Sequence, residues 1–151
     1  MGLDMFLSKK IYIGAKYEHR NVKLNVDLSI KDKKLNIDTD KVSYIIEEVA
    51  YWRKANHIHK WFVDNVQNGE DDCNEYDVSI EQLRNLLEVC KEVKQDNKLA
   101  ETLLPTTEGF FFGGTSYGEY YFEDIEYTIE ILEKAIEGYN YEDDFCYRSS
   151  W

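Results

Sequence analysis

The stretch DKVSYIIEEVAYWRKANHIHKWFVDNV, residues 40–66, decides the fold because it contains no glycine or proline. Tyr44, Tyr51, Ile58 and Phe62 recur at helical spacing on one side, and further apolar residues follow a second side. Asp40 is a suitable N-cap for such a helix. A helix that is apolar on more than one side is usually central to its domain. We therefore predict one long central helix over residues 40–66.

The segment VKLNVDLSI, residues 22–30, alternates apolar and polar residues before that helix. Such alternation is the period of a half-buried strand. The residues KDKK interrupt it, and Leu35 and Ile37 then resume it. We therefore predict a β-hairpin over residues 22–38 with its apolar face toward the core, joined by KIYIGAKY, residues 10–17, as a further strand.

The second half of the chain is typical of amphipathic helices. Ser79 and Gln82 form a capping-box pattern ahead of a helix over 79–96, and a short helical turn is expected over 97–104. A further helix over 121–138 ends at Gly138, whereas the tail, residues 139–151, has no clear period. We predict a single α+β domain over 1–151, with an N-terminal antiparallel hairpin or small sheet packed on the central helix and two or three further helices.

The charge of the chain limits its partners. Its 30 acidic and 18 basic residues give a net charge of −12, which repels polymeric nucleic acid and anionic membranes. No apolar run approaches the roughly 20 residues that span a bilayer, and the start MGLDMFLSKK lacks the features of a secretory signal or lipid anchor. The 3 cysteines are an odd number without a C-x-x-C pair, as in a reducing compartment. We expect a cytoplasmic protein.

The predicted central helix would carry a first candidate site. On a helix, Arg53, His57 and Lys60 would line one stripe beside Trp52 and Asn56. Guanidinium grips phosphate and indole stacks on a planar base, so this stripe, continued by the neighbouring Trp61, suits a small nucleotide. In the alternative interpretation the tryptophans are core residues and the cations pair with surface carboxylates.

The glycine-rich segment PTTEGFFFGGTSYGEYY, residues 105–121, is a second candidate site. A glycine-rich loop before a helix can present backbone N–H groups to a phosphate, although this one matches neither G-x-x-x-x-G-K-[ST] nor G-x-G-x-x-G. Its alternative interpretation is a buried strand over 110–112 followed by a turn. The candidate ligand-binding residues here are Phe112, Gly113, Gly114, Thr115, Ser116 and Tyr117.

The histidines do not form a recognisable metal or catalytic motif. On a helix His57 and His59 would point about 200° apart, so both could not bind one ion together with Asp71, Asp72 or Cys73. No Ser-His-Asp or Cys-His arrangement is specific either. We therefore predict no metal, no cofactor and no catalytic residues.

Three stretches of the chain resemble a known group of sequences. MGLDMFL, EEVAYWRKANHIHKWFVDNVQNGEDDC and LLPTTEGFFFGGTSYGEYYFEDIEYTIEILEKAIE are similar to a family of small bacteriophage and prophage proteins. The resemblance covers residues 1–7 and about 41–137. It implies a phage accessory protein in the host cytosol that counters host defence, and it supplies no established catalytic residues.

The phage resemblance and the cationic, aromatic and glycine-rich segments together lead to one functional hypothesis. We expect the protein to sequester a nucleotide-derived immune messenger, a cyclic oligonucleotide or an ADP-ribose derivative, without chemistry. Tight sequestration needs a deep pocket, so we also expect a homo-oligomer in which a second subunit completes it. Two alternatives stay open: a phosphodiesterase with His57 or His59 as general acid or base, and an acidic inhibitor of a host defence protein.

Overall fold

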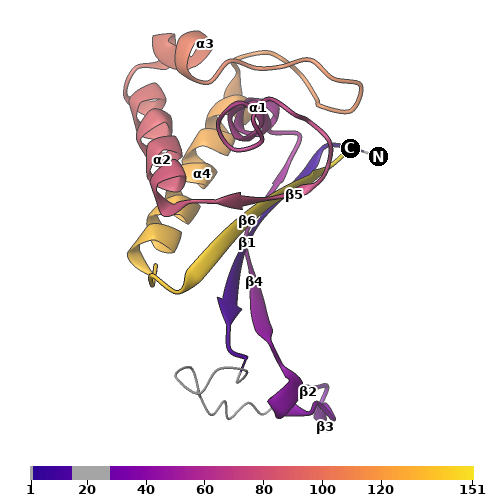
Figure 1. The fold of residues 1–151 in the computed structure, drawn as a ribbon. Helices are drawn as coiled ribbons and strands as arrows, with labels where there is room; N and C mark the ends of the chain where they lie inside the picture. Colours follow the sequence, from indigo (N-terminus) through magenta and orange to yellow (C-terminus); the bar gives the residue numbers. More distant parts are fainter. Residues whose placement is uncertain (1, 15–27) are drawn as a thin grey trace.

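The computed structural model describes residues 2–14 and 28–151 and shows an α+β fold (Figure 1). Four strands form an antiparallel sheet in the order β4-β1-β6-β5. These strands are β1 (Asp4–Tyr12), β4 (Tyr44–Arg53), β5 (Glu75–Val78) and β6 (Asp143–Ser150). The other elements are β2 (Ser29–Ile30), β3 (Lys33–Lys34), α1 (Asn56–Asn65), α2 (Ile80–Gln95), α3 (Ala100–Leu103), α4 (Glu119–Glu137) and the 3-10 turns η2 (Thr39–Lys41) and η3 (Asn97–Leu99). The prediction of an α+β fold is confirmed.

The prediction of one long helix over residues 40–66 is wrong. The first part of this stretch is strand β4, which pairs with β1, and only the second part is helix α1. Ala50 and Trp52 are buried two residues apart, which is the period of a strand. Lys54, with φ of 62°, lies in the left-handed region and separates the strand from the helix.

The predicted hairpin over residues 22–38 lies partly outside the described residues, since 15–27 are not described. Within the described part, β2 and β3 pair across Lys31 and Asp32, whose φ values of 48° and 62° are typical of a type I′ turn. The expected burial is wrong here, because Ile30 is 60% and Ile37 is 44% exposed. The hairpin lies at the far end of the β1–β4 arm, away from the helices (Figure 1).

The tail, residues 139–151, for which no element was predicted, contains strand β6. It pairs with β1 along one edge and with β5 along the other, so it is an interior strand of the sheet. Phe145 and Tyr147 are buried, and the Tyr147 ring stacks on Phe62 of α1 with centroids 3.9 Å apart. Strand β1, the other interior strand, buries Met5 and Leu7 in the same core.

The predicted C-terminal helices are confirmed. Helix α2 has the expected capping box, in which Ser79 accepts from the Gln82 N–H and the Gln82 side chain accepts from the Ser79 N–H. The short turn over 97–104 corresponds to η3 and α3, and the helix over 121–138 corresponds to α4. Helices α2 and α4 pack side by side on one face of the sheet (Figure 1), and their apolar sides close the core.

Candidate functional site

A pocket of about 320 Å³ lies where β4 ends and α1 begins. The segment before α4 and the first turn of α4 form its other walls. Six of the predicted site residues line it: Arg53, Asn56, His57, Gly113, Gly114 and Ser116. Its other lining residues are Lys54, Thr106, Tyr120, Tyr121, Glu123 and Asp124. We call it the α1 pocket. Residues of both predicted candidate segments line it.

Backbone hydrogen bonds to Leu3 hold the two segments of the α1 pocket next to each other. The Lys54 N–H donates to the Leu3 carbonyl at 2.8 Å, and the Leu3 N–H donates to the Phe111 carbonyl at 3.1 Å. Gly113, with φ of 89°, approaches so closely that a Cβ there would lie 3.1 Å from the Lys54 Cβ. Glycine is therefore required at position 113 for both its conformation and its contact.

The start of helix α1 is the electropositive wall of the α1 pocket. Its N-cap residue, Ala55, provides no side-chain hydrogen bond, and the first turn contains no acidic residue. The Arg53 Nε lies 4.0 Å from the Asp4 Oδ1, and Lys54 has no ion-pair partner among residues 2–14 and 28–151. Helix N-termini attract anions through free N–H groups and the helix dipole. Two adjacent cations strengthen this attraction.

Asn56 holds the glycine-rich segment in place. Its Nδ2 donates to the carbonyls of Phe112 at 3.1 Å and Gly114 at 2.9 Å, and its Oδ1 accepts from the Thr107 N–H at 3.1 Å. The side chain is 1% exposed. Asn56 therefore positions the segment, because its amide group is already engaged by the backbone.

His57 is buried in the wall of the α1 pocket. Its ring lies on that of Tyr121 with centroids 4.1 Å apart, and its Nε2 has no hydrogen-bond partner within the described part of the chain. Burial lowers the pKa of His57 from 6.5 to about 3, so the ring is neutral at neutral pH. An unpartnered buried ring nitrogen costs free energy, which a ligand group could recover.

We expect replacement of His57 by phenylalanine to flatten the pH dependence of stability. Between pH 6.5 and 3 the unfolded chain binds a proton at His57 and the native state does not, so the native protein loses stability as pH falls. The full difference is on the order of 5 kcal/mol. Denaturant unfolding of both proteins at several pH values measures it, and identical pH profiles would refute the assignment.

The acidic wall of the α1 pocket comes from the first turns of α4. Burial, and secondarily Glu123, raises the pKa of Asp124 to about 6. Tyr121 is fixed by its O–H, which donates to the Leu104 carbonyl at 2.8 Å, while Tyr120 is 83% exposed at the rim. Carboxylates opposite an anion site can accept hydrogen bonds from sugar hydroxyls or base amino groups. The α1 pocket is thus positive at one wall and hydrogen-bond accepting at the other.

The remaining predicted site residues lie elsewhere. Trp52 and Trp61 are 2% and 6% exposed core residues, and the Trp52 Nε1 donates to the Thr128 Oγ1 at 2.9 Å. The Arg53–His57–Lys60 stripe does not exist, because Arg53 belongs to β4 and not to a helix. Lys60 pairs with Asp64 at 2.7 Å and lines a second cavity.

The other predicted residues of the glycine-rich segment have structural contacts. The alternative interpretation predicted that Phe112 lies in a buried strand. In the structure Phe112 is not in a strand; it follows a turn and is 8% exposed. The Thr115 carbonyl accepts from the Thr106 Oγ1 at 3.1 Å, and the Tyr117 hydroxyl accepts from the Thr106 N–H at 3.2 Å. These bonds fold residues 105–118 back on themselves.

His59 does not face the α1 pocket. Its Nδ1 lies 2.8 Å from the Tyr147 hydroxyl and its Nε2 lies 2.9 Å from the Asp71 Oδ2, so both ring nitrogens are engaged. Within residues 2–14 and 28–151, no three His, Cys, Asp or Glu side chains are grouped as ligands for a metal ion.

No protein-family model, curated protein or solved structure matches this chain. The phage resemblance therefore stays a prediction, and function is argued from the geometry of the site. No helix in the described part of the chain has the length and apolar character needed to cross a membrane.

Proposed function

We propose that the protein binds a small nucleotide-derived anion, with a phosphate at the start of helix α1, and holds it without chemistry. The observation that carries this proposal is the N-terminus of α1, which lacks a side-chain cap and whose first two residues, Asn56 and His57, line the α1 pocket together with Arg53 and Lys54. Backbone N–H groups and two cations at one point are the chemistry that phosphate requires. The His57 Nε2, which has no hydrogen-bond partner in the described part of the chain, adds a further polar group at the same wall.

The rest of the α1 pocket favours a nucleotide over a bare phosphate. Tyr120 offers an exposed ring, and Glu123 and Asp124 offer acceptors for hydroxyl or amino groups. A volume of about 320 Å³ is near the lower end of ligand sites, which span roughly 300–1,000 Å³, so it suits one nucleotide unit. A cyclic oligonucleotide would need a further surface, and in our proposal a second subunit of a homo-oligomer supplies it.

In the proposed biological role, a phage protein in the host cytosol sequesters an immune second messenger. The resemblance to phage proteins supports this context, and the net charge of −12 disfavours longer nucleic acids as ligands. Sequestration at nanomolar affinity needs about 12 kcal/mol of binding free energy. A ligand held by both walls of the α1 pocket and by a second subunit is the route that we propose to such affinity.

A hydrolase is the second candidate function, and one observation favours it. His57 and Asp124 line the same pocket, and burial displaces their pKa values in opposite directions, to about 3 and about 6. A neutral histidine and a partly protonated carboxyl are an acid–base combination of the kind that enzymes use. His59 is the weaker candidate because Tyr147 and Asp71 engage both of its ring nitrogens.

A ligand-recovery experiment distinguishes these functions. Purified protein is incubated with cyclic dinucleotides, cyclic trinucleotides and ADP-ribose derivatives, separated from free ligand, denatured by heat and analysed by chromatography. Intact ligand in stoichiometric amount supports sequestration, and a converted product supports the hydrolase. If neither occurs, the nucleotide proposal is wrong, and an acidic inhibitor of a host protein becomes the function to test.

Substitution of Arg53 or Lys54 should weaken binding without unfolding the protein. We expect Arg53→Ala to reduce affinity for the recovered nucleotide more than tenfold, because charge-assisted bonds to phosphate contribute roughly 1.5–3 kcal/mol. Lys54→Gly should weaken binding similarly and preserve or raise the melting temperature, since glycine relieves the positive φ of 62°. Isothermal titration measures both affinities.

Lys98→Ala is the matched control for these two variants. Lys98 is an exposed lysine of η3 that does not line the α1 pocket. Its removal lowers the positive charge of the protein by the same amount and should leave affinity unchanged. Equal losses in all three variants would show that overall charge, and not the start of α1, determines binding.

A further inference from the structure

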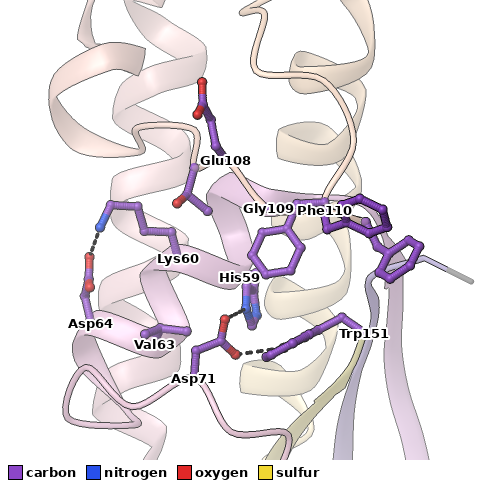
Figure 2. Close-up of a pocket in the computed structure, with 12 residues that line it drawn as sticks. His59, Lys60, Val63, Asp64, Asp71, Glu108, Gly109, Phe110 and Trp151 are labelled. Carbon is purple, nitrogen blue, oxygen red and sulfur yellow. Dashed lines mark hydrogen bonds and ion pairs between the residues drawn. The ribbon is translucent and has the colours of Figure 1, made fainter.

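A second cavity, of about 480 Å³, lies on the other side of the glycine-rich segment (Figure 2). We call it the Trp151 cavity. It shares no lining residue with the α1 pocket. Aromatic rings and carboxylates make up most of its side chains. The lining residues are His59, Lys60, Val63, Asp64, Asp71, Thr107, Glu108, Gly109, Phe110, Phe111, Phe112 and Trp151.

The aromatic walls of the Trp151 cavity are held in fixed orientations. The Trp151 Nε1 donates to the Asp71 Oδ1 at 2.9 Å, and its ring meets Phe112 edge to face with centroids 6.0 Å apart. Phe112 in turn packs edge to face against His59 at 5.1 Å. At the rim, Phe110 is 94% exposed, which leaves its ring free to contact a ligand. A preformed aromatic surface costs little entropy on binding.

A buried hydrogen-bond chain fixes a negative charge beside these rings. Burial raises the pKa of Tyr147 well above its usual value, and its hydroxyl lies 2.8 Å from the His59 Nδ1. The His59 Nε2 lies 2.9 Å from the Asp71 Oδ2. The Asp71 carboxylate thus lies within hydrogen-bond distance of both His59 and Trp151, as Figure 2 shows.

The charges around the Trp151 cavity select the sign of a ligand. Three carboxylates line it, from Asp64, Asp71 and Glu108, against the single ammonium group of Lys60. That ammonium group is paired with Asp64 at 2.7 Å and turns toward it in Figure 2. The net negative lining opposes an anion such as a nucleotide phosphate and attracts a cation.

We propose that the Trp151 cavity binds an organic cation, an alkylated ammonium group, between the rings of Trp151 and Phe110 and near the carboxylate of Asp71. Aromatic faces attract cations through the ring quadrupole, and apolar alkyl groups on nitrogen fit an aromatic wall better than a hydrated metal ion does. The volume of about 480 Å³ accommodates a group of this size. This site would act independently of the anion proposed for the α1 pocket.

Choline and its uncharged isostere 3,3-dimethylbutan-1-ol test this proposal directly. The two probes have nearly the same shape, and only choline carries a positive charge. Each is titrated into the full-length protein while the indole N–H signal of Trp151 is followed by NMR. We expect a saturable shift with choline and at least tenfold weaker binding of the isostere. Equal binding of the two probes, or no saturable shift with choline, would overturn the proposal.

Two exposed aromatic residues provide a matched pair of variants. Phe110→Ala removes a ring from the rim of the Trp151 cavity, whereas Tyr120→Ala removes another highly exposed ring, from the α1 pocket. We expect Phe110→Ala to weaken choline binding roughly fivefold, as for an exposed cation–π contact, and Tyr120→Ala to leave it unchanged. Unchanged choline affinity in Phe110→Ala would remove Phe110 from the site. Because neither probe carries phosphate, failure here would leave the nucleotide proposal standing.

Discussion

A chain truncated after Gly138 will not fold cooperatively. The truncation removes β6, which lies between β1 and β5 in the sheet, so the backbone hydrogen bonds that these two strands make to β6 are lost. It also removes Phe145 and Tyr147 from the core, and loss of one large buried aromatic side chain alone typically costs about 3–5 kcal/mol. Two such losses approach the 5–15 kcal/mol of total stability that is usual for a domain.

Thermal unfolding followed by near-ultraviolet circular dichroism measures this effect. We expect the truncated chain to show no cooperative transition and no near-ultraviolet signal. The control is removal of Trp151 alone, which leaves all of β6 and deletes the hydrogen bond to Asp71. That control should lose only about 1 kcal/mol. A cooperative transition in the chain truncated after Gly138 would mean that the folding of β1 and β5 does not depend on β6.

Asn56→Ala should strongly destabilise the protein at neutral pH. The substitution leaves the Thr107 N–H and the carbonyls of Phe112 and Gly114 without their buried partner. An unsatisfied buried polar group costs about 1–3 kcal/mol, and water entering the α1 pocket would offset part of it, so we expect a loss of about 3 kcal/mol. The glycine-rich segment should also detach from α1 and abolish nucleotide binding.

Denaturant unfolding and amide hydrogen exchange separate the global and local effects of Asn56→Ala. The Thr107 amide should exchange faster in the variant than in the parent protein. Asn65→Ala is the control on the same helix, because its Nδ2 makes one hydrogen bond, to the Trp61 carbonyl at 2.8 Å. That control should cost about 1 kcal/mol. Equal losses in the two variants would contradict the positioning role of Asn56.

The helices with local signals were predictable from sequence. The capping box of Ser79 and Gln82 and the charged outer face fix α2 within its own sequence, and Gly138 ends α4 in the same way. The β4–α1 stretch was not predictable, because its apolar residues fit a helical period while Ala50 and Trp52 also fit a strand. Pairing with β1 decided between the two, and pairing is a tertiary interaction that local periodicity does not record.

Strand β6 was missed because an interior strand need not alternate clearly. Cys146 is buried between the buried residues Phe145 and Tyr147, and the buried residue at position 149 is a serine. Both faces of this strand are therefore partly covered, which removes the contrast on which the period of two depends.

The candidate site was partly predictable. Arg53, His57 and the glycine-rich segment were identified from residue types, and the structure brings them to one pocket by a route different from the predicted helical stripe. Asp124 was missed because its carboxyl is one of 30 acidic side chains, and its pKa is raised to about 6 by burial and by the neighbouring Glu123, which only the fold shows. Charge counts from sequence do not distinguish a buried carboxylate from a solvated one.

The order of strands in the sheet also determines when the protein can fold during its synthesis. Strand β1 is made first, yet its interior partner is β6, and Asp4 pairs with Ser150 across almost the whole chain. The sheet therefore cannot close until residues 143–150 have left the ribosome. Until then β1 and β4 can pair only as a two-stranded ribbon, which is marginally stable in water. Such long-range pairing slows folding, and the nascent chain would expose its apolar strands to chaperones until β6 has been made.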